Sequence, residues 1–337
     1  MNKQSNKQFA VGVDVSQETL DVAAHSPSGE HRTAQFANAS AGHRQLIKWL
    51  TKGGRRARVV LESTGVYSLD LALALDAAKR IEVMVVNPRA ARKFADACLQ
   101  RSCTDTTMAV ALQEYAARME FVPWTPPTPA VREVRAIARR IAALTLEKSR
   151  ELNRQHAAGA SADTPAVVIK DVAVNVRHLE RRIAELERHA VVLIAADSQL
   201  QPIYQHLLSV CGIAETTAIQ LLGELLVLPA DMTARQWVAH SGLDVRHVTS
   251  GTSVHKIPRI SKQGNAQLRR ILYMPALVAI RHEPHVRAFY EQLLAAGKKP
   301  LQAVVAVMRK LLHAIWGMLQ SNTDFDGSKF RKLAEAA

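Results

Sequence analysis

The first hundred residues alternate between strand-like and helix-like stretches, and this order restricts the fold more than any other feature of the sequence. Residues 9–16 form an almost continuous apolar run with a single acid, Asp14, which is typical of a buried strand. Residues 20–24 and 31–36 flank a turn signal at residues 26–29 (SPSG) and are expected to form a strand hairpin. The next expected elements are a helix at 41–50, a strand at 58–62, a helix at 67–79 and a strand at 81–86, stopped by Asn87 and Pro88.

Three strands followed by helix, strand, helix and strand is the element order of a ribonuclease-H-like domain. The sequence therefore predicts a layered α/β fold for the N-terminal part of the chain. In such a sheet the first and fourth strands are neighbours, so Asp14 and Glu62, which closes the strand at 58–62, are expected to converge.

The middle of the chain has the periodicity of long helices. Residues 104–120 are helix-like, and several prolines between 123 and 129 then interrupt the chain. Two apolar heptad-like runs follow on either side of a polar break at 157–165, which predicts an antiparallel helical hairpin or a paired coiled coil. We favour an arm for oligomerisation or domain spacing over an internal helical bundle.

The third region, from about Tyr204 onward, is expected to be mostly helical, with one irregular segment at 242–264. The predicted domains are therefore a catalytic domain at residues 1–125, a helical coiled-coil arm and linker at 126–200, and a mostly α C-terminal domain at 201–337.

The charge balance indicates a polyanionic partner. The 337 residues include 44 Lys and Arg against 30 Asp and Glu, a formal net charge of +14. Nucleic acid is the commonest such partner, and a generic basic surface is the alternative. No apolar run approaches the ~18 residues of a membrane span, and the polar N-terminus does not resemble a signal peptide. The three cysteines lack metal-type spacing, which favours a reducing, cytoplasmic location.

Three acids are candidates for a catalytic centre. Asp14 lies inside an apolar strand, where an ionised carboxylate is unfavourable unless it is paired or bound to a metal. Glu62 ends a strand, and Asp105 begins the helix expected at 104–120, within reach of the same sheet edge. Converging carboxylates form a site for Mg²⁺, and two such ions can hold the attacking and leaving oxygens of a phosphoryl transfer. The alternative is that each acid is a strand-end or helix-start residue.

A basic segment is the second candidate. Residues 245–282 contain no Asp or Glu, and their cations are Arg246, Lys256, Arg259, Lys262, Arg269, Arg270 and Arg281. Only one aromatic residue, Tyr273, lies among them, so binding of phosphates is favoured over stacking on bases. A solvated loop is the alternative.

Two weaker signals lie beside this segment. Residues 207–218 (LLSVCGIAETTA) predict a helix, a tight turn at Gly212 and a second helix, which is either helix-hairpin-helix-like or a plain turn. Residues 249–254 (TSGTSV) form a small hydroxyl-rich loop, in which a serine surrounded by cations is a candidate nucleophile toward a phosphodiester.

Taken together, these motifs resemble the DEDD transposases of insertion sequences, a family that includes the Piv-type DNA invertases and has a RuvC-like catalytic domain. The N-terminal likeness rests on VGVDVS at 11–16, LESTGVY at 61–67 and Asn87-Pro88. The C-terminal likeness rests on SGTSV at 250–254, RISKQG at 259–264 and LRRILYMPA at 268–276. The resemblance covers nearly the whole chain.

The resemblance implies a recombinase that excises and inserts its element by DNA cleavage and strand exchange. By motif match, Asp14, Glu62 and Asp105 would bind Mg²⁺, and Ser250 would be the nucleophile that joins covalently to DNA. Lys256, Arg259, Lys262, Arg269 and Arg270 are the expected nucleic-acid-binding residues. The resemblance further implies donor and target DNA as partners, a structured bridge RNA that pairs with both, and homodimers that assemble into tetramers.

The sequence departs from the family pattern at the third motif. The family has two acids three residues apart, but this chain reads TDTTMA at 104–109, with Met108 at the position of the second acid. A thioether is a poor Mg²⁺ ligand. Three explanations are open: three acids are enough to bind the metal, Glu114 or a water replaces the missing ligand, or the protein is catalytically impaired. Cys211 and Ala214 also stand where the family usually has Pro and Gly. The alternative functions are a catalytically impaired nucleic-acid-binding relative and a RuvC-like junction-resolving nuclease.

Overall fold

The computed structural model describes residues 8–26, 29–63, 65, 67–99, 102 and 104–330. Parts of the turn at 26–29 and of the 61–67 motif, as well as Cys103 and the polar N-terminus, lie outside these described residues. The chain divides into two compact units, Met1–Pro126 and Pro127–Ala337, and each is considered by itself.

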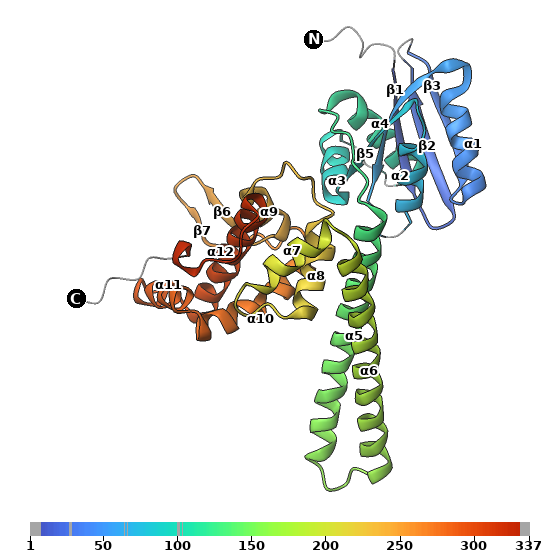
Figure 1. The fold of residues 1–337 in the computed structure, drawn as a ribbon. Helices are drawn as coiled ribbons and strands as arrows, with labels where there is room; N and C mark the ends of the chain where they lie inside the picture. Colours follow the sequence, from blue (N-terminus) through green and yellow to red (C-terminus); the bar gives the residue numbers. More distant parts are fainter. Residues whose placement is uncertain are drawn as a thin grey trace. The chain divides into compact units, whose positions relative to one another are not determined.

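The first unit is built on a five-stranded mixed sheet with the strand order β3-β2-β1-β4-β5 (Figure 1). Strands β1, β4 and β5 are parallel, whereas β2 and β3 extend the sheet by antiparallel pairing. The expected element order is confirmed, and β1 and β4 are neighbours as expected. The strands are β1 (Gln8–Val15), β2 (Thr19–His25), β3 (His31–Ala37), β4 (Arg56–Glu62) and β5 (Ile81–Val86).

Both faces of this sheet are covered, because its central strands carry apolar side chains on each face. In β4, Val59 and Leu61 pack into one core together with Leu46 and Leu71, while Val60 packs into a second core with Leu112. The first core is covered by α1 (Ser40–Thr51) and α2 (Leu69–Asp76), and the second by α3 (Pro88–Ala97) and α4 (Asp105–Arg118).

Helix α3 was not expected from the sequence, where Asn87 and Pro88 were interpreted only as the end of a strand. The Asn87 side chain accepts a hydrogen bond from the Arg89 amide at 2.8 Å, and Pro88 occupies the first turn. Asn followed by Pro is a helix-start signal as well as a strand stop, so the sequence did contain the information.

The second unit begins with a long helical hairpin, as predicted. Helices α5 (Pro129–Gly159) and α6 (Ala166–Ala196) run antiparallel (Figure 1). Two ion pairs, Lys148–Glu180 and His189–Glu133, connect them along their length. Buried residues occur only in the part of the hairpin nearest the other helices, up to Leu144 in α5 and from Val176 in α6. The hairpin is therefore partly a projecting arm and partly a member of a helical bundle.

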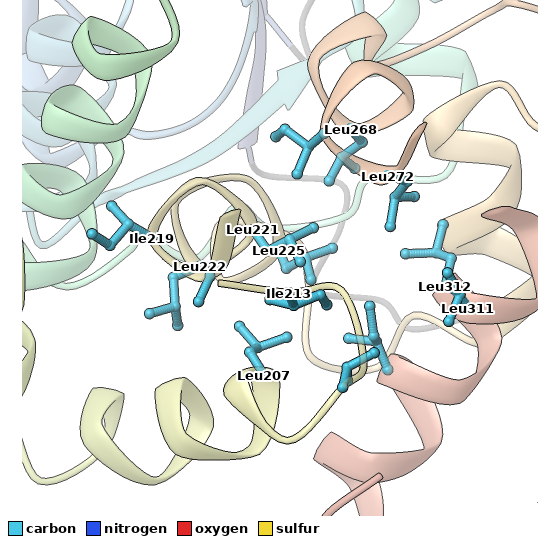
Figure 2. Close-up of a cluster of buried hydrophobic side chains, with 14 of the residues drawn as sticks. Leu207, Ile213, Ile219, Leu221, Leu222, Leu225, Leu268, Leu272, Leu311 and Leu312 are labelled. Carbon is cyan, nitrogen blue, oxygen red and sulfur yellow. The ribbon is translucent and has the colours of Figure 1, made fainter. Parts of the chain in front are cut away.

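The remaining helices of this unit share one hydrophobic core with the base of the hairpin. Figure 2 shows its centre, where Leu207, Leu222, Leu268 and Leu311 from four different helices converge. These helices are α7 (Leu200–Leu208), α8 (Glu215–Leu225), α9 (Ala234–Ser241), α10 (Ala266–His282), α11 (Pro284–Ala295) and α12 (Pro300–Ser321). A boundary at residue 200 between an arm and a terminal domain stays a prediction.

The helix–turn–helix expected around Gly212 is present between α7 and α8. Gly212 has φ +92°, and a Cβ built there would lie 2.7 Å from the Pro275 carbonyl oxygen of α10. A side chain is excluded both by the backbone conformation and by this close approach.

The expectation of an irregular segment at 242–264 was wrong. Most of this segment forms a two-stranded antiparallel sheet of β6 (Val245–Ser250) and β7 (Val254–Ile260). The β-branched residues on either side of the Thr-Ser-Gly-Thr-Ser loop are a hairpin signal that the sequence analysis did not use. In the described residues, no helix is long and apolar enough to cross a membrane.

Candidate active site

Asp14 and Glu62 lie side by side near the carboxyl ends of two parallel strands. The register of β1 and β4 pairs Val13 with Leu61, so the next residues, Asp14 and Glu62, are level with each other. Burial raises the pKa of Glu62. Burial is also the largest of the causes that raise the pKa of Asp14. The strand register thus brings together two of the acids that the sequence singled out.

Asp105 joins this pair because α4 packs directly across β1. A Cβ on Gly12 would lie 2.1 Å from the carbonyl oxygen of Ala109, so the glycine lets the helix backbone touch the strand. Thr104 caps the helix, with a side chain that accepts from the Thr107 amide, and Asp105 occupies the first turn. The pKa of Asp14 rises to about 6, through burial first and then through the negative charges of Asp105 and Glu62.

A fourth acid, Asp21, belongs to the same environment and was missed by the sequence analysis. It lies directly opposite Asp14 in the β1–β2 pairing and contributes a small further rise to the pKa of Asp14. The Asp21 carboxylate accepts hydrogen bonds from Gln35 at 3.2 Å and from Thr106 of α4 at 3.5 Å. The hairpin register, which was not worked out from the sequence, would have placed it there.

Met108 is part of the hydrophobic core between α4 and the sheet. Its side chain is 9% exposed and packs with Val60, Val86 and Leu112 under the sheet. Glu114 does not replace the missing acid either, because it pairs with Arg118 and lies nine residues beyond Asp105. Nine residues correspond to about two and a half helical turns, which puts Glu114 on the other side of α4 and roughly 13 Å along its axis.

The acids suit a hard divalent cation such as Mg²⁺ by their chemistry. All donors are carboxylate oxygens, and a cation would relieve the repulsion that raises the pKa of Asp14. In the part of the chain that the structure describes, however, no three Asp, Glu, His or Cys side chains lie close enough together to hold a metal ion. Metal binding by Asp14, Glu62 and Asp105 therefore stays a prediction.

Ser250 ends β6 at the tip of the hairpin of the second unit. It pairs with Val254 and is exposed, and the following Gly251 has φ +54° with open space around its Cα. The hairpin strands contain no acid, so Ser250 has no carboxylate neighbour within them.

The predicted nucleic-acid-binding residues fall into two groups. Lys256 and Arg259 are exposed on β7, and Lys262 is exposed just beyond it. Arg269 and Arg270 lie on α10, where Arg269 donates to the Ser241 carbonyl at 2.7 Å and Arg270 contacts Gln267. Arg269 therefore also holds the end of α9.

A buried carboxylate, that of Glu224, connects the base of the α5–α6 hairpin and the segment after β7 to helix α8. Glu224 on α8 is 2% exposed and accepts hydrogen bonds from Arg139 of α5 at 2.8 Å and from Asn265 at 2.6 Å. Burial opposes ionisation of Glu224, but these hydrogen bonds outweigh it and lower its pKa. Asn265 in turn caps α10, so α5, α8 and the chain that leaves β7 meet at one ionic junction.

Comparison with known families covers both units. A family model described as a transposase matches residues 11–158, and a model described as the transposase IS116/IS110/IS902 family matches residues 204–291. The protein is thus an enzyme of the transposase class, which cuts and rejoins DNA. More narrowly, the chain belongs to the IS110 family of DEDD transposases.

The similar proteins agree with this assignment. Pilin gene-inverting proteins of Moraxella bovis and Moraxella lacunata are each 26% identical, over 94% of this chain and 97% of theirs. An uncharacterized 43.6 kDa protein of insertion element IS110 from Streptomyces coelicolor is 27% identical over 44% of this chain and 35% of its own length.

Proposed function

We propose that the protein is a metal-dependent DNA recombinase that moves its insertion sequence through a covalent serine–DNA intermediate. The observation that carries this proposal is the placement of Asp14 and Glu62 at the ends of two neighbouring strands, with Asp105 at the start of the helix packed across them. Burial first, and then the charges of Asp105 and Glu62, raise the pKa of Asp14 to about 6. Such a grouping is typical of a functional site. The mixed sheet order supports assigning the first unit to the ribonuclease-H/RuvC-like class.

In this proposal the two halves of the chain have different roles. The Ser250 hydroxyl attacks a backbone phosphorus, a new ester bond forms to Oγ, and the deoxyribose oxygen on the opposite side leaves and takes up a proton. A strand hydroxyl then attacks the serine phosphoester, which rejoins DNA and restores the serine. Lys256, Arg259, Lys262, Arg269 and Arg270 would hold the backbone. Bound Mg²⁺ would neutralise the phosphate oxygens during both attacks.

Ser250 needs an activating group, because a serine hydroxyl is a weak nucleophile at neutral pH. Its own hairpin offers cations but no carboxylate. The acids of a first unit, from the same chain or from a second copy, would supply the base or the metal. The family resemblance favours the second copy, because it implies homodimers that assemble into tetramers.

The partners follow from the family likeness and the charge of the chain. Donor and target DNA would be the substrates, and a structured bridge RNA encoded by the element would select them by base pairing. The names of the Moraxella relatives, which describe inversion of a pilin gene, support DNA rearrangement as the reaction.

Covalent trapping tests the proposal. Full-length protein is incubated with Mg²⁺, RNA transcribed from the flank of the element and labelled duplex spanning its end, and protein-bound label is separated in denaturant. We expect an adduct with the wild type, at least a hundredfold less with Ser250→Ala, and an unchanged yield with the control Ser253→Ala in the same loop. Cleavage that needs Mg²⁺ but leaves no adduct would instead identify a RuvC-like nuclease.

A catalytically impaired relative is the second candidate, favoured by one observation. Met108 occupies the family's acidic position, is buried in the core and offers only a thioether, which is a poor Mg²⁺ ligand. Specific DNA binding without adducts or cleavage, in the same assay, would establish this alternative.

A further inference from the structure

The β6–β7 hairpin is a ribbon exposed on both faces. None of its strand residues is buried, although five of them are Val or Ile. A two-stranded hairpin is only marginally stable alone in water, and a two-stranded ribbon has the width that fits a groove of duplex DNA. These features indicate a surface that becomes covered when a partner binds.

The strand register assigns the cations to one face. Arg246 pairs with Arg259, Val248 with Lys256, and Ser250 with Val254. Residues 246, 248 and 250 alternate along β6 and therefore lie on the same face, and their antiparallel partners share it. Three cations thus lie on the face that also carries Ser250.

A β-bulge interrupts the regular alternation of β7 at Ile257-Pro258. Between the first two pairs, β6 advances by two residues but β7 advances by three, so β7 has one extra residue at Ile257-Pro258. Bulges commonly redirect a side chain. Ile257 is 75% exposed, and a hollow of about 590 Å³ is lined by Ile257 together with Arg246, Val248, Lys256 and Arg259.

We propose that duplex DNA binds along the face that carries the three cations and that Ile257 is a wedge, inserted at a base step about three base pairs from the phosphate that Ser250 attacks. The cations would hold the backbone on either side, and the bulge would aim the isoleucine at the stacked bases. This inference rests on the proposed function, because it takes Ser250 as the attacking residue.

Duplex DNA is inferred as the binding partner of the ribbon from the charge and the chemistry of its exposed residues. The face offers three cations, and residues 245–282 contain no acid, which complements a polyanion and disfavours a protein partner of ordinary charge. An exposed isoleucine has no role in binding phosphates, but apolar side chains of this kind are inserted between base steps by proteins that kink DNA. Ile257 lies three residues from Val254, the partner of Ser250, which is about 10 Å along the ribbon.

Base unstacking provides the test. Full-length protein is titrated against a 30-base-pair DNA duplex containing 2-aminopurine at its centre, either fully paired or beside a single mismatch. We expect binding to increase the fluorescence at least twofold and to favour the mismatched duplex about fivefold, since a mismatch makes unstacking easier.

Variants on the same hairpin provide the controls. Ile257→Ala should lose the fluorescence increase and the mismatch preference but keep the salt dependence of binding. Val245→Ala removes another exposed apolar side chain of the same ribbon, 43% exposed and not among the residues that line the hollow, and should keep all three properties. Ile257→Lys should bind more tightly overall, yet still lose the fluorescence increase. Circular dichroism and thermal melting confirm that each variant is folded.

The inference would be overturned if Ile257→Ala retained the fluorescence increase, or if an RNA duplex of the same sequence gave a larger increase than DNA. Ser250→Ala separates this result from the proposed function. If the wild type forms no covalent adduct, but the wild type and Ser250→Ala both unstack the DNA, the serine mechanism is wrong. The insertion of Ile257 into DNA would still be supported.

Discussion

At the scale of single residues, Asp14 has the most unusual environment of the acidic group. Burial, and then the charges of Asp105, Glu62 and Asp21, disfavour its ionised form and raise its pKa from 3.8 to about 6. The sequence predicted that an acid inside an apolar strand needs a cation. Only the strand pairing revealed that Asp21 is a further neighbour.

Asp14 should make the metal-free protein less stable as the pH rises. Its folded-state pKa lies above its unfolded value, so its contribution to stability is complete below pH ~4 and is lost as the pH rises through about 6. A shift of two units would be worth about 3 kcal/mol in a fully buried site. Solvent screening of this partly buried group reduces it to about 1 kcal/mol.

Asp14→Asn should therefore be more stable than the wild type by about 1 kcal/mol at pH ~8 in chelator, and equally stable at pH ~4. Urea unfolding of both proteins at the two pH values measures this difference. A constant difference across the pH range would show that the asparagine acts through packing and not through the charge of Asp14.

At the scale of elements, the contact between α4 and β1 sets the position of Asp105. Gly12 is the residue that permits it, because the backbone of Ala109 and Gln113 occupies the space of a side chain. From the sequence, Gly12 was only one residue of an apolar strand. The need for glycine there is set by a helix about a hundred residues later in the chain.

Gly12→Ala should destabilise the protein by about 1–3 kcal/mol, since the new Cβ forces α4 away from the sheet. Displacement of α4 should also lower the pKa of Asp14, because Asp105 would move away. Gly317→Ala in α12 is the matched control, with no atom within 4 Å of its new Cβ. It should stabilise the helix by about 0.5–1 kcal/mol.

Urea unfolding gives both free energies, and NMR titration of the carboxyl groups gives the pKa. If Gly12→Ala were neutral, α4 would not be packed against β1 as closely as described, and Asp105 would lose its place beside Asp14.

At the scale of the whole molecule, a net charge of +14 could be spread over the entire surface or concentrated at one binding site. The structure places Arg246, Lys256 and Arg259 on one face of an exposed ribbon. Each phosphate contact contributes about 0.9 to the slope of log K against log salt concentration on duplex DNA.

Replacing Arg246, Lys256 and Arg259 by Gln should therefore flatten that slope by about 2.7. Replacing Lys52, Lys79 and Lys93, which are exposed on the first unit, lowers the net charge equally and should leave the slope unchanged. Fluorescence anisotropy at several salt concentrations measures both variants. Equal slopes in the two variants would mean that binding depends on overall charge and not on the ribbon.

The sequence by itself determined the elements that depend on local periodicity. The buried strand around Asp14, the order of strands and helices in the first unit, the long hairpin of α5 and α6 and the turn at Gly212 all follow from the spacing of apolar residues and from Gly or Pro signals. It also predicted that Asp14 and Glu62 converge, because the strand order places the ends of β1 and β4 together.

Only the tertiary structure decided what depends on contacts between distant segments. The register of β1 and β2 put Asp21 beside Asp14, the packing of α4 buried Met108, and the β6–β7 ribbon left Ile257 exposed at a hollow lined by cations. The physical reason is that periodicity fixes which face of an element is apolar. It does not fix which residue of another element lies opposite, because that depends on pairing and packing across the whole unit.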